Sequence, residues 1–539
     1  MSLTLTWTVL SLQATWIRKI ITNGLRSCTR VNTRNISTAF VYESPTISAL
    51  AEFVADLVSP KEMAQIMRSE VEQMLTLVGK YSNDFPEHNP STVLGKKKRG
   101  GDVILITGTT GSVGASTLAE LLESSKVEKV YALNRPHKKG LPLVTRQKRA
   151  FTSQGLKGDL VLSEKLVMLE GDLGRSCLGL EESVQQGVCN KDPSSRPPSS
   201  CAPVCFLLDA RFAYAHYAYR YAPSPIVIFS SSVIFHAWLN VFRRFPAAWR
   251  VDFNLTLLSF ETYIADLRRL IDFALSCRLP EPPRFLFLSS IAAVSRLENL
   301  LPILEHAVPA AAAIGSGYGE SKWVAEALLS EAIARTPLHV VIVRSGQVSG
   351  GLNGYWNSSD WFPSMIQSAS SVKCLPLTST ESVSTYRSYG TVSLLIFVIQ
   401  QTVSFIPLDV AAKAIADMRD SPTQILHLAH PSPVPWNSVI RRTADMLSVP
   451  LVYYRDWVSR LERVGDDGDS SESPSALRLL DFFQKANLDG SSESPCVSSE
   501  IMGLPRLSMK RSIEYLPRLS EMREIVGEVG KWLKYWNMP

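Results

Sequence analysis

Short apolar runs alternate with amphipathic segments through the middle of the chain. Leu118, Leu121 and Leu122 recur at helical spacing and predict a helix between the first two of these runs. Strands are predicted at Val103–Ile106, Val130–Leu133, Leu166–Leu169, Phe285–Leu288 and Val340–Val343. Strands that alternate with helices in this way favour an α/β fold, in which helices cover both faces of a parallel sheet.

The flanking regions have a different pattern. The first 60 residues predict a helix at Leu12–Ile21 and an amphipathic helix at Thr46–Leu57. A charged helix and a linker rich in Pro, Gly and Lys fill residues 61–100. Beyond about residue 430 the pattern is mostly helical, so we assign the α/β domain to residues 101–430 and a smaller cap on its substrate side to residues 431–539.

Two regions predict no regular element. Residues 185–246 are rich in Ser and Pro and then in aromatic residues, and residues 378–402 interrupt what should be a short connection. Loops this long are uncommon in compact domains. Either region is a genuine insertion, or both are translated intervening sequence, which sequencing the transcript would decide. Two polar segments, Asp466–Pro474 and Asp489–Pro495, share the letters SSESP and predict flexible loops.

Composition narrows the class of protein. Of 539 residues, 45% are hydrophobic and 20% are charged, which is typical of a globular protein. The net charge of +6 is spread thinly apart from Lys96–Arg99, which lies beside two glycines. This pattern predicts a solvated linker, and nothing else indicates a nucleic-acid partner.

Cysteine usage and hydropathy point to a cytoplasmic protein. The eight cysteines include no C-x-x-C pair, and Cys189, Cys201 and Cys205 have no companion histidines at ligand spacing, so no metal is expected. The N-terminus lacks a basic start and a clear cleavage site, which argues against secretion. The apolar stretch 391–401 is shorter than the roughly 20 residues that a membrane span needs, so no membrane partner is expected.

A glycine-rich turn follows the first predicted strand. It has the form G-x-x-G-x-x-G and leads into the predicted helix. A strand, such a turn, a helix and a second strand together hold a dinucleotide pyrophosphate, because glycines admit the phosphates and the helix N-terminus supplies free N–H groups. The sequence therefore predicts an NAD(P)-binding Rossmann fold, with cofactor contacts at Gly108, Thr110, Gly111, Ser112, Val113 and Gly114.

The end of the second strand indicates which cofactor is preferred. An acidic residue there would bind the ribose 2′-hydroxyl of NAD, whereas an arginine pairs with the 2′-phosphate of NADP. This chain has Arg135, followed by Lys138 and Lys139. We expect Arg135 to bind NADPH and the two lysines to lie in a solvated loop.

Three residues downstream suit carbonyl reduction. Ser290 ends a predicted strand, and Tyr318 and Lys322 lie four residues apart at the start of a predicted helix, hence on one face. A tyrosine hydroxyl with a pKa near 10 becomes an effective proton donor and acceptor when a neighbouring cation stabilises the phenolate. Lys322 provides that charge and also binds the nicotinamide ribose, while Ser290 stabilises the charge that develops on the substrate oxygen. A surface tyrosine and lysine is the plainer alternative.

These motifs resemble the extended short-chain dehydrogenase/reductase superfamily. The finer resemblance is to a thioester reductase domain, the one at the C-terminus of fungal adenylate-forming reductases. These reductases are similar to nonribosomal peptide synthetases and are relatives of aminoadipate reductase. It covers most of residues 1–60 and 101–539. The motifs that carry it are ITGTTGSVG, KVYALNRP, RQKRAF, LEGDL, AWRVDFNL, FLFLSSI, GYGESKWVAE, VRSGQVSGG and FIPLDVAA.

The resemblance implies a function and further roles. It implies NADPH-dependent reduction of a carrier-bound acyl thioester to an aldehyde. It places Asp172 by the adenine, Arg344 and Gln347 on the far side of the site, and Trp361 against the substrate. The residues alone leave other roles open, namely a turn for Asp172, a structural ion pair for Arg344 and core packing for Trp361.

The N-terminal segment resembles the second half of an acyl carrier domain. In that family a serine within Asp-Ser-Leu carries phosphopantetheine, and Ser11 is the matching position. Leu10 stands where the aspartate is expected and the carrier's first helix is missing, so Ser11 is either the attachment site or a plain helix N-cap. Another departure is Pro246-Ala247, where the reductase family has an asparagine in the loop.

The chain shows no adenylation domain that would activate an acid. The adenylation partner is therefore expected in a fuller chain or as a separate protein. Two other functions stay open at this point: a reductase or dehydrogenase for free carbonyl or alcohol substrates that uses the same three residues, and an NADP-binding protein without catalysis.

Overall fold

A computed structural model describes most of the chain from residue 46 onward. The described residues are 21, 46–57, 60–90, 101–137, 139–171, 226–229, 249, 255–277, 281–297, 301–378, 401–466, 475–485 and 500–539. The predicted helix Leu12–Ile21, the Lys96–Arg99 run and the segments Asp466–Pro474 and Asp489–Pro495 lie wholly or almost wholly outside them.

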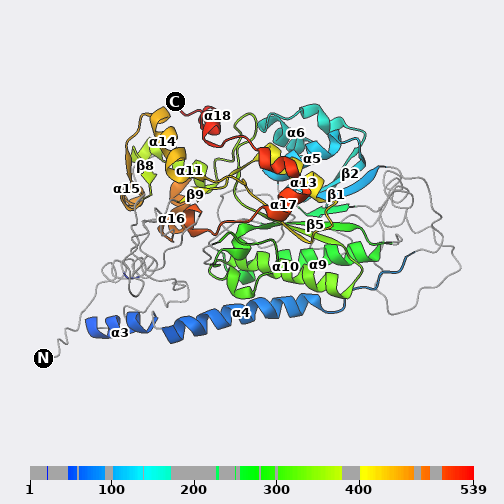
Figure 1. Cartoon of the computed structure of the whole chain (residues 1–539), viewed down its shortest axis with the longest axis horizontal. Helices are drawn as coiled ribbons and strands as arrows, with labels where there is room; N and C mark the ends of the chain where they lie inside the picture. The colour runs from blue at the N-terminus through cyan, green and yellow to red at the C-terminus, as the bar shows by residue number, and fades with distance from the viewer. Residues whose placement is uncertain are drawn as a thin grey trace, which may run out of the picture.

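Within the described residues, a sheet of seven parallel strands forms the centre of the molecule (Figure 1). Its order is β11-β6-β5-β4-β1-β2-β3. The strands are β1 (Asp102–Thr107), β2 (Val127–Asn134), β3 (Leu166–Glu170), β4 (Ile226–Phe229), β5 (Arg284–Ser290), β6 (Val340–Ser345) and β11 (Ile425–Leu428). The α/β fold class is confirmed, and all five predicted strands are present.

Two strands of this sheet, β4 and β11, were not predicted from the sequence. Strand β4 lies inside residues 185–246, for which no element was expected, and it pairs with β1 on one side and β5 on the other. That expectation is wrong for residues 226–229. A central parallel strand shows no alternation of apolar and polar residues, and four residues are too few to establish any period. The other residues of this region lie outside the described part of the chain.

Helices cover both faces of the sheet. The strands present alternate side chains to opposite faces, so Phe285 and Phe287 of β5 pack with α9 and α10, and Leu286 and Leu288 pack with α5 and α13. The helices concerned are α5 (Ser112–Glu123), α6 (Leu143–Ser153), α9 (Glu261–Ser276), α10 (Gly317–Arg335) and α13 (Leu408–Met418). Both faces are buried, which explains the continuous apolar runs of the strands.

A separate hydrophobic core forms the cap, at the end of the molecule where α14 and α15 lie in Figure 1. Large aromatic residues dominate it, with Trp356 stacked on Phe362 at a ring-centroid distance of 4.9 Å and Trp532 5.0 Å from Trp356. Its elements are α11 (Trp361–Gln367), α12 (Ala369–Val372), β8 (Leu375–Leu377), α14 (Trp436–Leu447), β13 (Leu451–Tyr453), α15 (Tyr454–Asp466), α16 (Leu480–Lys485) and α18 (Val529–Tyr535).

The packing does not divide at a single boundary near residue 430. Helices α11 and α12 and strand β8 precede that residue but pack into the cap core. In the other direction, α17 (Lys510–Tyr515) returns to the sheet, where the Ser512 hydroxyl donates to the carbonyl of His427 in β11 at 2.7 Å. The chain therefore passes back and forth between the two cores, because the apolar faces of these segments match the core they reach rather than their place in sequence.

Helix α4 (Pro60–Ser82) lies along α9 and α10 (Figure 1). Met74 and Leu77 are buried against the sheet domain, and Lys80 donates to Glu261 of α9 at 2.6 Å. The charged helix predicted at the start of residues 61–100 is present as α4, and its second half packs as part of the α/β body. Helix α3 (Ile47–Leu57) precedes it and matches the predicted Thr46–Leu57 helix.

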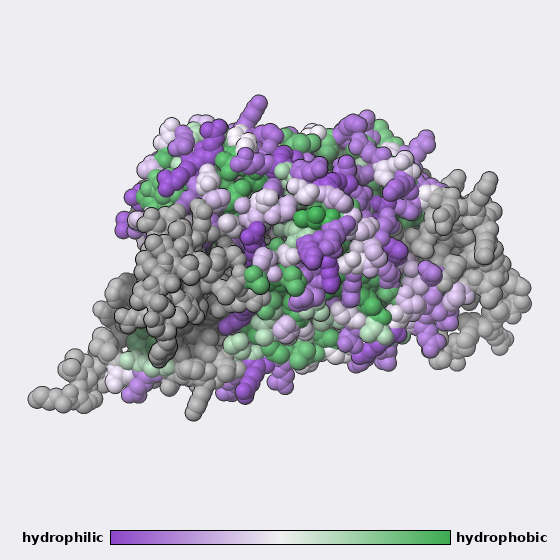
Figure 2. Space-filling model, viewed as in Figure 1, coloured by the Kyte–Doolittle hydropathy of each residue, from purple (hydrophilic) through white to green (hydrophobic). Residues whose placement is uncertain are grey.

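Most of the face seen in Figure 2 is hydrophilic, and apolar side chains gather on it over α4 and α10. An open groove there is lined by α4 residues, among them Met67, Val71 and Leu75, and by Ala311 and Ile314. None of the helices in the described part combines the length and apolar character that a membrane-spanning segment requires.

Candidate functional site

The glycine-rich turn connects β1 to α5 at the point where the strand order reverses. Strand β1 lies between β4 and β2, and this switch point is where open α/β sheets bind nucleotides. Gly108 has φ of 71°, a left-handed conformation that favours glycine, and the Gly111 N–H donates to its carbonyl at 3.1 Å. Helix α5 begins at Ser112, so its free N–H groups face the carboxyl edge of the sheet.

Two polar side chains hold this turn in place. Asn134, the last residue of β2, donates to the Thr109 hydroxyl at 2.7 Å, and that hydroxyl donates to Gln147 of α6 at 2.8 Å. Gln147 in turn donates to the Thr109 carbonyl at 2.9 Å. These two roles were not predicted from the sequence, although both residues lie in motifs that carried the resemblance. The turn is preorganised for a ligand because its polar groups are already bonded.

Arg135 follows β2 directly and is exposed. The guanidinium of Arg146 in α6 donates to the Arg135 carbonyl at 2.9 Å and to Glu170 at 2.6 Å. Two arginines therefore lie next to each other at the carboxyl end of β2. Asp172 and Lys138, also named from the sequence, lie outside the described residues.

Ser290 and Tyr318 meet at the carboxyl end of β5. The Ser290 hydroxyl accepts the Ala292 N–H at 3.2 Å and is hydrogen-bonded to the hydroxyl of Tyr318. Burial raises the pKa of Tyr318 to about 12, and the bond to Ser290 acts in the opposite direction. Tyr318 therefore keeps its proton at neutral pH and can donate it.

Lys322 lies one turn further along α10 and is fully buried. Its Nζ donates to the Leu288 carbonyl at 3.0 Å and lies 4.6 Å from the ring centre of Trp249. Burial lowers the pKa of Lys322 well below its usual value, and the carboxylate of Glu326 acts against that shift. The distance from Lys322 Nζ to the ring centre of Tyr318 is 5.8 Å. Trp249 was not singled out from the sequence, although it lies in the AWRVDFNL motif.

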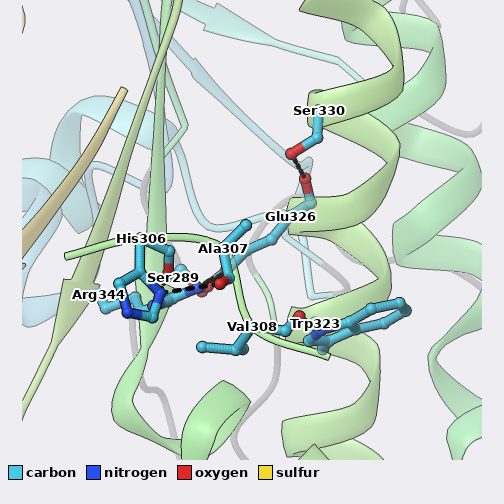
Figure 3. Close-up of polar contacts among 8 residues, drawn as sticks. All are labelled: Ser289, His306, Ala307, Val308, Trp323, Glu326, Ser330 and Arg344. Atoms are coloured by element: carbon cyan, nitrogen blue, oxygen red, sulfur yellow. Dashed lines mark hydrogen bonds and ion pairs between the residues drawn. The ribbon is translucent and has the colours of Figure 1, made fainter. Parts of the chain in front are cut away.

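A buried ion pair supports this part of α10 (Figure 3). Arg344 of β6 pairs with Glu326 at 2.7 Å and donates to the His306 carbonyl at 2.9 Å. The Ser289 hydroxyl donates to the same carboxylate. Arg344 is fully buried and its guanidinium is paired with Glu326. It therefore forms a structural ion pair, which is one of the two roles that the residues alone had left open.

Gln347 and Trp361 lie together beside the end of β6. The Trp361 indole N–H donates to the Gln347 side-chain oxygen at 2.8 Å. Both residues line a small cavity, to which Ile291, Gly346, Ser404 and Glu500 also contribute. Because Ile291 follows Ser290 directly, the cavity adjoins the proposed catalytic residues.

The parallel strands bring most of the predicted site residues to one edge of the sheet. The glycine-rich turn follows β1, and Ser290 ends β5 beside Tyr318. Lys322 lies one turn after Tyr318 on α10. Ser11 and the Pro246-Ala247 departure lie outside the described residues. Glu326 and Glu500 were not found from the sequence, because their partners are far from them in the chain.

Known proteins are similar to this chain in sequence. A family model described as male sterility protein, an NAD-binding family, matches residues 106–191 and 250–415. Adenylate-forming reductase Nps10 from Heterobasidion annosum is 34% identical over 98% of this chain. The chain spans 42% of the length of that reductase.

Solved structures show the same fold. The terminal R domain from the myxalamid PKS-NRPS biosynthetic pathway has a TM-score of 0.58 at 19% identity, over 87% of this chain and 97% of its own. A thiolation-reductase di-domain from an archaeal non-ribosomal peptide synthetase has a TM-score of 0.53 at 14% identity, over 98% of this chain and 91% of its own.

Proposed function

The chain is a relative of the adenylate-forming reductases and an NAD(P)-dependent oxidoreductase of the Rossmann type, and from this premise we propose that it reduces a carrier-bound acyl thioester to an aldehyde with NADPH. The observation that carries the proposal is the meeting of Ser290, Tyr318 and Lys322 beside the nucleotide turn. The relatives named above act in adenylate-forming and peptide-synthetase systems, which supports a thioester rather than a free carbonyl.

The residues at the turn fit a nicotinamide dinucleotide. A left-handed Gly108, a buried Gly111 and Gly114, and free N–H groups at the start of α5 suit a pyrophosphate. When bound, the cofactor supplies a hydride to the substrate carbonyl. Arg135 and Arg146 lie where a 2′-phosphate would be recognised, which supports NADPH over NADH.

The protein's own groups handle the oxygen and the proton. Ser290 and Tyr318 donate hydrogen bonds to the thioester oxygen, and Tyr318 transfers its proton as negative charge develops there. The positive charge of protonated Lys322 stabilises the phenolate that remains. The resulting thiohemiacetal loses its hydroxyl proton and breaks its C–S bond, which leaves an aldehyde and releases the carrier thiol with that proton.

The test uses the full chain with NADPH and a panel of acyl-pantetheine thioesters. Loss of nicotinamide absorbance together with a trapped aldehyde is the expected result. Tyr318→Phe should lower kcat by about 100-fold or more, the range of general acid catalysis, while NADPH binding changes little. Unchanged aldehyde formation by this variant would refute the role of Tyr318, and turnover of free carbonyls alone would refute the thioester substrate.

We further propose the domain order given by the sequence: a partial carrier at 1–60, a linker at 61–100, the reductase domain at 101–430 with insertions at 185–246 and 378–402, and the cap at 431–539. In the folded chain α4 of the linker region packs on the reductase body, and α11, α12 and β8 contribute to the cap core. The family match omits residues 192–249, which supports the first insertion. The buried Cys374 forms no disulfide with any described residue, which supports a reducing compartment, and we assign the reaction to the cytoplasm.

The carrier is also part of the proposal. A phosphopantetheine on Ser11, or on a partner carrier, would present the acyl group, and an adenylation domain in cis or in trans would load it. Incubation with a phosphopantetheinyl transferase and coenzyme A should add one phosphopantetheine mass to the chain but not to the Ser11→Ala variant. No mass gain would assign the carrier to a partner protein.

A further inference from the structure

The small cavity at the carboxyl edge of the sheet adjoins the reacting centre. Ile291 follows Ser290, and Gly346 follows Ser345, which is the register partner of Ser290 in β6. An acyl thioester whose carbonyl lies at Ser290 and Tyr318 therefore has this cavity as its neighbour. The cavity is about 30 Å³ in volume, which admits a single small group rather than an acyl chain. The next inference rests on the proposed thioester reduction and concerns which terminal group of the acyl chain the cavity accepts.

The cavity is mostly apolar but contains one buried carboxyl group. Ile291 and Phe405 form part of its apolar wall, and Trp361 adds a flat aromatic surface. Glu500 also lines it and is only 7% exposed. Burying a carboxyl group in apolar surroundings is costly unless hydrogen bonds compensate, so its partners determine what it can do.

Ser404 supplies the compensating bonds from the protein. Its N–H donates to Glu500 Oε2 at 2.8 Å, and its hydroxyl donates to Oε1. Each carboxyl oxygen can accept two hydrogen bonds. Glu500 is thus anchored to the cap by Ser404 and keeps acceptor capacity. Gln347, another polar side chain of the cavity, accepts a hydrogen bond from Trp361.

We propose that Glu500 recognises a hydrogen-bond donor at the far end of the acyl group, an ammonium or a hydroxyl, while the thioester carbonyl is held by Ser290 and Tyr318. The substrate class is then a short acyl or aroyl thioester that carries a distal donor. Plain fatty acyl groups leave the Glu500 carboxyl without that bond and are poorer substrates.

The electrostatics of the cavity agree with this assignment. Burial raises the pKa of Glu500 to about 7, whereas the bonds from Ser404 and the charge of Arg506 act in the opposite direction. An ammonium beside the carboxyl favours its ionised form and would form a buried ion pair, whereas a hydroxyl needs only one acceptor oxygen. The two donors can therefore be distinguished by removing the charge alone.

The experiment measures kcat/KM of the full chain with NADPH for matched pantetheine thioesters. The panel is hexanoyl, ω-hydroxyhexanoyl and ω-aminohexanoyl, with benzoyl, para-hydroxybenzoyl and para-aminomethylbenzoyl beside them. Wild type should prefer a donor-bearing member over the plain one by about tenfold, which corresponds to one good hydrogen bond of about 1.4 kcal/mol.

Two substitutions separate the donors. Glu500→Leu should abolish the preference for the donor-bearing member of each matched pair. The readout is the ratio of the two kcat/KM values within a pair, because an overall loss of turnover cancels in that ratio. Glu500→Gln keeps an acceptor oxygen but no charge, so it should lower turnover of the amino substrates only. Glu305→Gln is the matched control, because Glu305 is a buried glutamate that binds Ser512 outside the cavity, and it should leave the preference unchanged.

The outcomes separate this inference from the proposed function. If plain and donor-bearing thioesters react equally and Glu500→Leu changes nothing, the assignment of Glu500 is overturned while thioester reduction stands. If no thioester of the panel is reduced, the proposed function fails and the inference fails with it.

Discussion

Individual side chains show how burial sets the chemistry of the site. Tyr318 and Lys322 are nearly or fully buried, and desolvation moves the pKa of the tyrosine upward and that of the lysine downward. Both shifts favour the neutral form of each group. A tyrosine that holds its proton suits the donor step, and the Glu326 carboxylate one turn away on α10 favours the charged lysine that the resulting phenolate requires.

Arg135 is expected to decide the choice of cofactor. In Arg135→Asp, the KM for NADPH should rise about tenfold or more, because a carboxylate repels the 2′-phosphate, and the KM for NADH should fall. Steady-state kinetics with both cofactors check this. Lys139→Asp is the matched control, since Lys139 is a nearby exposed basic residue of the same loop. An equal effect of the two substitutions would contradict a specific role of Arg135.

His427 should make the fold sensitive to acid. Burial lowers its pKa from 6.5 to about 3, so the unfolded chain binds this proton first as the pH falls. Because the folded-state pKa is depressed, the free energy of unfolding is unaffected by this histidine above pH 6.5. Below that pH it falls progressively, by about 2 kcal/mol at pH 5. Denaturant unfolding should show a smaller loss between pH 7 and pH 5 for His427→Gln than for wild type. Parallel losses would contradict this effect.

At the scale of elements, one carboxylate fastens three of them together. Glu326 of α10 pairs with Arg344 of β6 and accepts the hydroxyl of Ser289 in β5 (Figure 3). The proposed catalytic face of α10 lies one turn away, so this junction fixes the helix that carries Tyr318 and Lys322 against the strand that ends at Ser290.

Removing that carboxylate charge should destabilise the fold. Glu326→Gln leaves Arg344 buried without its counter-ion, which costs about 3 kcal/mol or more in the free energy of unfolding. Chemical denaturation measures this. Glu331→Gln is the matched control on the same helix, because its pair with Arg335 is partly exposed and contributes less than about 1 kcal/mol. Similar losses for the two variants would refute the structural role of the buried pair.

At the scale of the whole molecule, one loop connects the nucleotide turn to the C-terminal helix. The Tyr355 hydroxyl is 2.9 Å from the hydroxyl of Ser112, the first residue of α5. The ring of Tyr355 packs against Tyr535 of α18 at 5.4 Å. The same loop approaches α18 closely at Gly354, where a Cβ would lie 2.1 Å from the Lys531 carbonyl oxygen. The cap and the cofactor site are thus joined through this loop.

Gly354→Ala should therefore separate α18 from the loop. Gly354 has φ of +84°, so the variant combines backbone strain with the clash, and a loss of about 3 kcal/mol or more is expected, together with weaker NADPH binding. Gly140→Ala is the control, because Gly140 also has a positive φ, +69°, but nothing within 4 Å of a Cβ. The control should lose only about 1 to 2 kcal/mol, the cost of the conformation alone. Equal losses of unfolding free energy for Gly354→Ala and Gly140→Ala, measured by thermal or chemical unfolding, would show that the close approach to α18 does not contribute to stability.

Local patterns in the sequence determined the fold class and the core of the candidate site. The alternation of apolar runs with helical periods predicted the α/β sheet and five of its strands. The glycine-rich turn and the i, i+4 spacing of Tyr318 and Lys322 could be recognised from the sequence because they depend on residues close together in the chain. Strand β4 could not be predicted in this way, because its few residues pair with neighbours that only the folded sheet supplies.

Only the tertiary structure brought together residues that are far apart in the chain at the candidate site. Glu326 and Arg344 are 18 residues apart, and Ser404 and Glu500 are 96 apart. The sequence named Arg344 but could not decide between a site residue and an ion pair, and it contained no signal for Glu500. The physical reason is that desolvation and pairing depend on what surrounds a group in space. The spacing of apolar residues along the chain does not predict which segments of the cap return to the edge of the sheet.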